Sequence, residues 1–294
     1  MFATTCEAGN ANRGAVADFI TERQYLKNVT PKTVAWYGDA FKAFDGALES
    51  QATIKGRIVE LRTRGISATS VNSWLRCINA FLKWDQAGFK IPKLKEEQKV
   101  LATLSPEQMT RLIAFKPKGI NQTRTHTAAL LMLDGGYRVS ELLGLAFEGC
   151  DFDNLVVKVR GKGNKHRLVP LSLNMRKSLY RHAVKHSGPG RLLFGTRNNT
   201  LVTVRNFQRD FKVIGAKLGI TGVRFSPRTL RHTFAVSYLR AGGNLFYLSK
   251  ILGHSSVTTT QHYLQSVGVD DLQAVHDRLS PLAPAHLRAA GLGR

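Results

Sequence analysis

The sequence has few cysteines and no long apolar run. Its 294 residues include three cysteines, Cys6, Cys77 and Cys150, an odd and scattered set that excludes a disulfide framework and a four-thiolate zinc site. No stretch approaches the roughly 18 uncharged apolar residues that a membrane span needs. The first residues, MFATTCEAGNANR, lack the apolar stretch behind a basic start that marks a secretory signal. We therefore expect a soluble cytoplasmic protein with no membrane partner.

Acidic residues are scarce in one long segment. The chain carries 43 Lys and Arg residues against 20 Asp and Glu residues, and residues 155–240 hold 19 of the basic ones but a single acidic one, Asp210. Such a segment repels itself unless it binds a polyanion, and the release of counterions from neutralised phosphates makes nucleic acid the favoured partner. An anionic membrane is less favoured, because no basic amphipathic helix stands out there. A merely basic soluble protein is less favoured again.

The first part of the chain is typical of a small helical domain. We expect a flexible tail over residues 1–12 and a helical domain over residues 13–90. Thr30 before Pro31 is a strong helix start, with Thr as N-cap and Pro at the first helical position. Residues 91–103 (IPKLKEEQKVLAT) are charged and weakly periodic, so we expect a linker there.

A second domain is predicted over residues 104–294. Ser105 and Gln108 fit a capping box that opens its first helix. The segments LVVKVR and RLVPL flank the polar GKGNKH, a pattern that predicts a basic β-hairpin. Most other segments have helical spacing. The predicted fold class is therefore mostly α with a small antiparallel β-sheet, giving an α+β second domain behind a helical N-terminal domain.

Two arginines fall at the start of a predicted helix in SPRTLRHTF. Ser226 is suited to the N-cap, and Arg228 and Arg231 are three residues apart, so both project from one side of the helix. Cations in the first turn oppose the helix dipole and cost a few tenths of a kcal/mol each. The same helix terminus attracts phosphate. The pair therefore favours an anion-binding role over a purely structural one.

Short motifs in the second domain hold further candidate residues. They are Arg138 and Glu141 in GGYRVSELLGL, Lys162 in the GKG hairpin, Arg231 in RTLRHTF, His254 in LGH, and Tyr263 nine residues later. In order and spacing these motifs resemble the tyrosine recombinase, or phage integrase, family of the short two-domain type, over residues 104–270. The resemblance implies that Arg138, Lys162, Arg231, His254 and Tyr263 are catalytic, that Tyr263 is the nucleophile, and that Glu141 supports them. It also implies that the helical domain is a core-binding, DNA-binding domain.

One motif position departs from the family pattern. The family usually has His where this chain has Arg228, and that histidine is thought to handle the proton of the nucleophile. A guanidinium stays protonated above pH 12, so Arg228 can bind phosphate but is not suited to proton transfer. We include Arg228 among the catalytic residues in this phosphate-binding role. His254, water, or another histidine such as His262 stay open as the base.

The resemblance implies a site-specific DNA recombinase. It would cut and rejoin double-stranded DNA through a covalent 3′-phosphotyrosine at Tyr263, and both integration or excision of a mobile element and resolution of DNA stay open. Lys162, on a flexible hairpin tip, suits a general acid for the departing 5′ oxygen. Because the covalent intermediate conserves the energy of the broken bond, neither ATP nor a metal nor another cofactor is expected.

The resemblance also implies a homo-oligomer on DNA, with four protomers in a synapse that joins two sites; accessory proteins cannot be read from the sequence. After Tyr263, Leu272, Val275 and Leu279 recur at helical spacing. We expect this helix to pack on a neighbouring subunit. Packing on its own domain is almost equally favoured.

Two other functions stay open. A type IB topoisomerase-like enzyme would nick and reseal DNA without exchanging strands, and the short helical N-terminal domain counts against it. A non-catalytic DNA-binding regulator derived from a recombinase would tolerate Arg228, but the retained Tyr263 and Lys162 count against it.

A metal site is not indicated. His182 and His186 have i,i+4 spacing but lack the Glu of an H-E-x-x-H zinc motif. The basic half of the second domain also lacks the carboxylate cluster that a two-metal nuclease needs.

Overall fold

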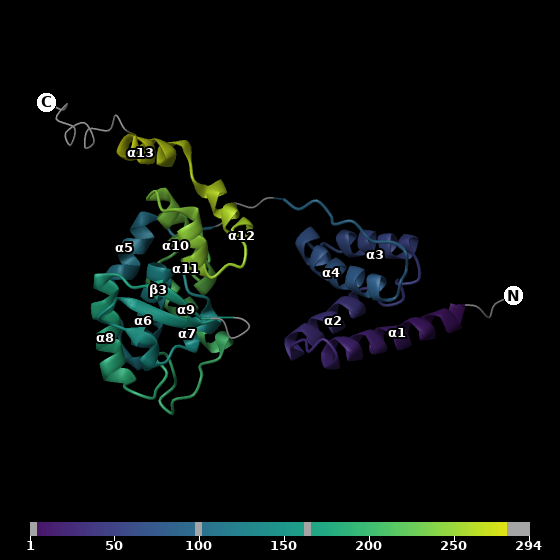
Figure 1. The fold of residues 1–294 in the computed structure, drawn as a ribbon, viewed down its shortest axis with the longest axis horizontal. Coiled ribbons are helices and arrows are strands. Elements are labelled where there is room, and N and C mark those ends of the chain that lie inside the picture. Colours follow the sequence, from purple (N-terminus) through teal and green to yellow (C-terminus); the bar gives the residue numbers. More distant parts are fainter. Residues whose placement is uncertain (1–4, 98–101, 162–165, 281–294) are drawn as a thin grey trace. The chain divides into compact units, whose positions relative to one another are not determined.

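The computed structural model describes residues 5–97, 102–161 and 166–280. The chain divides into two compact units, Met1–Lys99 and Val100–Arg294 (Figure 1). Both are rich in helix, and the second contains a small antiparallel sheet, which confirms the predicted fold class. No helix in the described part of the chain is long and apolar enough to cross a membrane.

Four helices make up the described part of the first unit, residues 5–97. They are α1 (Thr5–Tyr25), α2 (Pro31–Ala43), α3 (Gln51–Thr63) and α4 (Ala68–Trp84). α1 begins inside the stretch 1–12 that the sequence predicts as a tail. The start of α2 is as predicted, because the Thr30 hydroxyl accepts a hydrogen bond from the Thr33 backbone N–H. The buried Phe19 ring packs edge-to-face on Phe41 and Phe81, so an aromatic cluster holds α1, α2 and α4 together.

The segment that follows α4 is attached to that helix. Asn79 exchanges two hydrogen bonds with the Ile91 backbone, at 2.8 and 2.9 Å, and Asn72 makes the same pair with Leu94. Ile91 is also buried. Residues 91–96 therefore lie on the first unit, although their charged composition predicts a linker. Composition is misleading here because the backbone of the segment makes the attachment.

The second unit contains the remaining elements. They are α5 (Pro106–Ala114), α6 (Gly119–Gly135), α7 (Val139–Leu143), η1 (Phe147–Gly149), β1 (Cys150–Asp151), β2 (Val156–Arg160), β3 (His166–Pro170), α8 (Leu173–His186), α9 (Val204–Lys217), α10 (Pro227–Arg240), α11 (Leu245–Leu252), α12 (Thr258–Gln261), η3 (His262–Ser266) and α13 (Val269–Leu279). The predicted capping box at Ser105 and Gln108 opens α5. The helix α6, which is largely buried over residues 125–135, packs against α8, α9 and α10, so it lies at the centre of the unit.

The sheet has the strand order β1-β2-β3, and all pairs are antiparallel. β2 and β3 form the predicted hairpin, with Val157 opposite Val169. Val157, Val159 and Val169 are fully buried, because alternate residues of a strand face the same side. The short strand β1 is not predicted from the sequence, since two residues give no period to detect.

A glycine pair at the end of α6 lets three helices meet. Gly136 has a φ of +63°, which glycine adopts without strain. A Cβ on Gly136 would lie 2.5 Å from the Phe234 ring on α10 and 2.7 Å from the Leu252 side chain on α11. The close approach brings the start of α7, the middle of α10 and the end of α11 to one place.

Candidate active site

Arg231 is a buried arginine held by main-chain carbonyls. It is 8% exposed, and its guanidinium donates to the carbonyls of Gly136 at 2.5 Å and Leu252 at 2.8 Å. Burial and the nearby charge of Arg138 lower its pKa to about 10. No carboxylate lies within ion-pair distance of Arg231 in residues 5–97, 102–161 and 166–280. A buried cation without an acidic partner favours binding of an external anion.

Arg138 lies beside Arg231. One of its guanidinium nitrogens donates to the Gly253 carbonyl at 3.0 Å, the next carbonyl along the chain from the one that Arg231 binds at Leu252. The Arg138 side chain is 39% exposed. Consecutive carbonyls at the end of α11 therefore hold two guanidiniums together, where their mutual repulsion favours an anion between or above them.

Glu141 holds two arginines at once. Its carboxylate accepts from the backbone N–H and the guanidinium of Arg138, and from two guanidinium nitrogens of Arg167, all at 2.8 to 2.9 Å. Burial raises the pKa of this carboxyl, but the hydrogen bonds from Arg167 and Arg138 outweigh burial and hold the pKa below its ordinary value. Glu141 is therefore a charged group that holds the Arg138 side chain in place.

Arg167 on β3 is absent from the residues that the motifs single out. Besides its bidentate pair with Glu141, its Nε donates to the Ile251 carbonyl at 2.8 Å. A Cβ on Gly253 would lie 2.9 Å from the Arg167 side chain, so this glycine permits the contact. The alternation of β3 could have found Arg167, since it points to the same side as the buried Val169.

His254 contacts Arg231 through one ring nitrogen and Thr260 through the other. The distances are 3.0 Å from Nε2 to the Arg231 guanidinium and 2.8 Å from Nδ1 to the Thr260 hydroxyl. Because a guanidinium can only donate, Nε2 must accept and Nδ1 must carry the proton. Burial and the charge of Arg231 lower the His254 pKa to about 4, in agreement with a neutral ring that orients Arg231.

Tyr263 on η3 is 2% exposed. Its hydroxyl lies 3.2 Å from Nδ1 of His232, and His262 packs its ring 4.0 Å from the tyrosine ring. Burial raises the Tyr263 pKa, while the charge of Arg231 and a hydrogen bond from it act in the opposite direction. The nucleophile candidate is thus directly beside one of the two central arginines.

Arg228 and His232 form a second pair on α10. Arg228 is exposed on the first turn, and its Nε donates to Nε2 of His232 at 3.0 Å. His232 is not among the residues predicted from the motifs, although it directly follows Arg231 in RTLRHTF. His232 lies four residues after Arg228 on the helix, and side chains at that spacing are neighbours on the helix surface.

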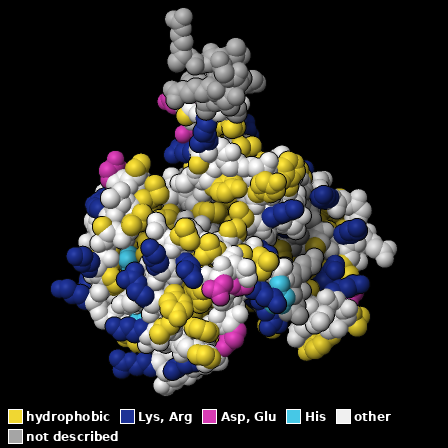
Figure 2. All heavy atoms as spheres, turned by 60° about the vertical axis from the view of Figure 1, so that its left-hand side comes forward, with side chains coloured by type: hydrophobic (Ala, Val, Ile, Leu, Met, Phe, Trp, Pro, Cys, Tyr) yellow, Lys and Arg dark blue, Asp and Glu magenta, His cyan; other side chains and the backbone are white. Residues whose placement is uncertain are grey.

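A cavity of about 910 Å³ opens beside Arg138, Glu141 and His254. It is lined by Arg138, Ser140, Glu141, Arg160, Gly161, His166, Arg167, Gly253, His254, Ser255 and Thr259. The one carboxylate in the lining, Glu141, is already bound to two arginines, so the cavity is positively charged. Lys162 lies outside the described residues, in the connection between Gly161 and His166. Lys and Arg side chains also outnumber Asp and Glu on the face drawn in Figure 2.

The sequence-predicted residues therefore fall into three groups. Arg138, Glu141, Arg231, His254 and Tyr263 meet around the end of α11 and the start of α10. Arg228 reaches this group through His232. The structure does not describe Lys162.

Metal ligands do not gather in the described residues, where no group of three or more His, Cys, Asp and Glu side chains could hold an ion. His182 is buried and its Nε2 contacts the Leu193 carbonyl at 2.8 Å. Its role is packing.

The chain is similar to known proteins over most of its length. The profile of the "Phage integrase family" matches residues 102–267. Tyrosine recombinase XerC of Syntrophus aciditrophicus is 32% identical over 202 residues, which cover 64% of this chain and 64% of that protein. Tyrosine recombinase XerD of Shewanella oneidensis is 29% identical over 290 residues, which cover 90% of this chain and 95% of that protein.

Solved structures share the fold. The Tn1549 transposon integrase in complex with transposon right end DNA has a TM-score of 0.71 at 20% identity, covering 91% of this chain and 98% of that one. The XerH site-specific recombinase bound to a palindromic difH substrate, a post-cleavage complex, has a TM-score of 0.69 at 16% identity, covering 90% and 83%.

Proposed function

The chain belongs to the phage integrase family of tyrosine recombinases, and from this premise we propose that it cuts and rejoins double-stranded DNA at specific sites through a 3′-phosphotyrosine at Tyr263. The observation that carries the proposal is the Tyr263 hydroxyl within reach of the buried, carbonyl-held Arg231. The similar transposon integrase and XerH were solved with DNA. A phosphodiester is the substrate that fits a tyrosine nucleophile beside guanidiniums.

The two central arginines would bind the scissile phosphate. A phosphodiester resists attack because it is anionic, and its pentacoordinate transition state carries more negative charge. Arg138 and Arg231 are fixed in advance by the carbonyls of Gly253 and Leu252, so they lose little freedom when that charge develops. Such preorganised donors lower the barrier by binding the transition state more tightly than the ground state.

The nucleophile would be the Tyr263 oxygen. A phenol with a pKa near 10 is ionised about one part in a thousand at pH 7, which costs about 4 kcal/mol. Arg231 offsets part of this cost and burial adds to it. When the oxygen bonds to phosphorus, the bond to the 5′ oxygen breaks, and Lys162 would supply its proton. A 5′-hydroxyl reverses the step, so rejoining needs no added energy source.

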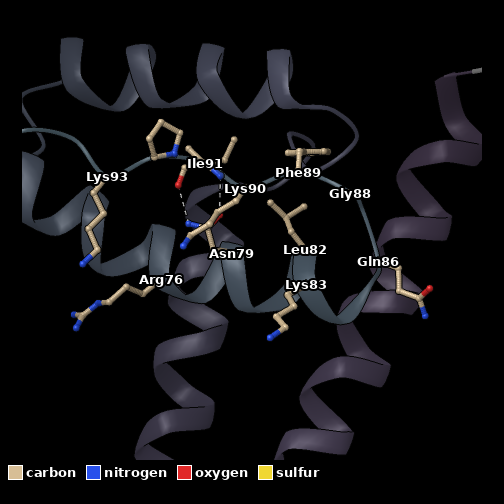
Figure 3. A pocket seen from close by; sticks show the side chains of 11 residues that line it. Arg76, Asn79, Leu82, Lys83, Gln86, Gly88, Phe89, Lys90, Ile91 and Lys93 are labelled. Carbon is tan, nitrogen blue, oxygen red and sulfur yellow. Dashed lines mark hydrogen bonds between the residues drawn. The ribbon is translucent and has the colours of Figure 1, made fainter.

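The first unit would contact DNA through a basic cavity of about 1120 Å³. Its lining includes Arg76 and Lys83 on α4 and Lys90 and Lys93 from the attached segment (Figure 3). Asn79 has a structural role in this lining, since its side chain is hydrogen-bonded to the Ile91 backbone (Figure 3). Four cations on one surface suit the phosphate backbone, and their contribution should fall with rising salt.

Strand exchange would take four protomers. α13 contacts its own domain through the Arg278 bond to the Ala241 carbonyl and the Arg240–Asp271 ion pair. Its apolar Leu272 and Leu279 are 60% and 62% exposed. We expect a neighbouring subunit to cover them in the synapse. Integration or excision of a mobile element and resolution of DNA use the same chemistry and are both included in the proposal.

The test is a covalent trap. Wild-type protein and Tyr263→Phe are incubated with fragmented genomic DNA, denatured, and the protein-linked strands are sequenced. We expect strands attached at one recurring sequence for the wild type and none for the variant, which should still shift DNA on a native gel. DNA binding without any adduct in either protein would favour a non-catalytic regulator. Adducts that never yield exchanged strands would favour a nicking-closing enzyme.

A further inference from the structure

The proposed cleavage leaves one proton without an acceptor. The Tyr263 O–H must release it when the oxygen bonds to phosphorus, and Arg228, which stands where the family usually has His, cannot accept it. His254 has both ring nitrogens in use, with Arg231 and Thr260. His262 makes a hydrogen bond to the Thr259 backbone. Among the described residues, the histidine nitrogen that is hydrogen-bonded to the tyrosine hydroxyl is Nδ1 of His232.

The contact with Arg228 fixes the tautomer of His232. The Arg228 N–H donates to Nε2 at 3.0 Å, and a guanidinium has no acceptor. Nε2 is therefore unprotonated and Nδ1 carries the hydrogen. That hydrogen points at the Tyr263 oxygen, 3.2 Å from Nδ1. In this state His232 is a donor to the tyrosine and cannot take its proton.

We propose that His232 accepts the Tyr263 proton, and that Arg228 holds it in the donor form until a DNA phosphate draws the guanidinium away. The inference rests on the proposed function and assigns a catalytic residue for it. Arg228 can make this move because it is exposed, whereas His232 is 9% exposed. The same arginine would then bind the phosphate and release the base, so that the base becomes available only where DNA is bound.

Every proton in the proposed cleavage and rejoining steps has a donor and an acceptor. Once Arg228 leaves, water protonates Nε2 and removes the hydrogen from Nδ1, which changes the tautomer but not the charge. The tyrosine O–H proton then passes to Nδ1, giving an imidazolium as the O–P bond forms. The P–O5′ bond breaks, and the 5′ oxygen takes its proton from the general acid. On rejoining, Tyr263 leaves phosphorus and recovers the proton from Nδ1.

The surroundings of His232 agree with this switch. The pKa of His232 is lowered to about 4. Burial is the largest cause, and the charges of Arg228, His262 and Arg231 lower the pKa further. Departure of Arg228 removes one of these charges, and an arriving phosphate adds a negative one, so both changes raise the pKa of the ring toward the range of an effective base.

The first test is His232→Asn, because the asparagine amide can still donate to Tyr263 but cannot hold a proton. The substrate is the duplex recovered from wild-type adducts. We expect the variant to bind it as the wild type does and to form adduct about 100-fold more slowly or worse. His186→Asn, on α8, should leave the rate unchanged. A His232→Asn rate within about threefold of the wild type would overturn the assignment.

A sulfur in place of the 5′ oxygen separates base from acid, because a thiolate leaves without a proton. We expect this duplex to restore cleavage to Lys162→Ala and not to His232→Asn. Rescue of His232→Asn by sulfur would also overturn the proposal. If the wild type forms no adduct at all, the proposed function fails rather than the assignment of the base.

The control of the His232 tautomer by Arg228 can be measured directly. In ¹⁵N-histidine spectra of the Tyr263→Phe protein, we expect His232 to carry its proton on Nδ1 without DNA and on Nε2, or on both nitrogens, with the duplex bound. An unchanged Nδ1 tautomer in the DNA complex would show that Arg228 does not control the base.

Discussion

Glu141→Gln should destabilise the second unit strongly. The carboxylate accepts four hydrogen bonds, two from Arg138 and two from Arg167. A glutamine keeps the shape but turns one oxygen into a donor, so about half of these bonds fail. Hydrogen bonds to charged groups contribute about 1.5–3 kcal/mol each, and breaking a buried ion pair costs about 3–5 kcal/mol.

Solvent reduces that cost, because Arg138 is 39% exposed and can be rehydrated. We therefore expect a loss of about 3 kcal/mol, or about 6–12 °C in the melting temperature of a unit of this size. The assay is urea unfolding followed by circular dichroism. Asp153→Asn is the control, since its side chain is 96% exposed, and it should leave the midpoint unchanged.

The stability difference between Glu141→Gln and the wild type should depend on pH. The folded-state pKa of Glu141 is lowered from about 4.5, so its stabilisation is fully present above that pH and is lost as the pH falls through the folded value. The difference between Glu141→Gln and the wild type should be constant from about pH 7 to pH 5 and shrink below about pH 4.5. An equal difference at low and neutral pH, or none at neutral pH, would refute the charged-support role.

Three other changes test the site and the surfaces around it. Gly253→Ala should destabilise the protein by about 1–3 kcal/mol and slow adduct formation, because φ is +65° and the new Cβ would meet Arg167 at 2.9 Å; wild-type melting and adduct rates would contradict this. Arg76→Ala and Lys83→Ala should each weaken binding on all sequences and reduce the salt slope by about 1, measured by fluorescence anisotropy against NaCl; an unchanged slope would remove α4 from the interface. Leu272→Asp should leave the monomer's melting and DNA binding intact but abolish strand exchange, measured on a two-site plasmid; normal exchange would show that no neighbour covers α13.

The sequence alone determined most of the helices, the β2–β3 hairpin and most of the candidate site residues. Helix starts at Thr30, Ser105 and Ser226 follow from local hydrogen bonding between a hydroxyl and backbone N–H groups a few residues away. The β2–β3 hairpin follows from alternation around a polar turn. Such signals lie within a few neighbouring residues and can be read without knowing the fold. The motif residues were likewise readable by their types and spacing.

Only the tertiary structure decided which of these side chains act on each other. Arg228 and Arg231 look equivalent on their helix, yet Arg231 is buried against carbonyls from α6 and α11 while Arg228 is exposed and faces His232. The same packing sets Tyr263 beside His232, 31 residues away. Burial, pKa and tautomer depend on groups that arrive from distant parts of the chain, and helical spacing carries no information about them.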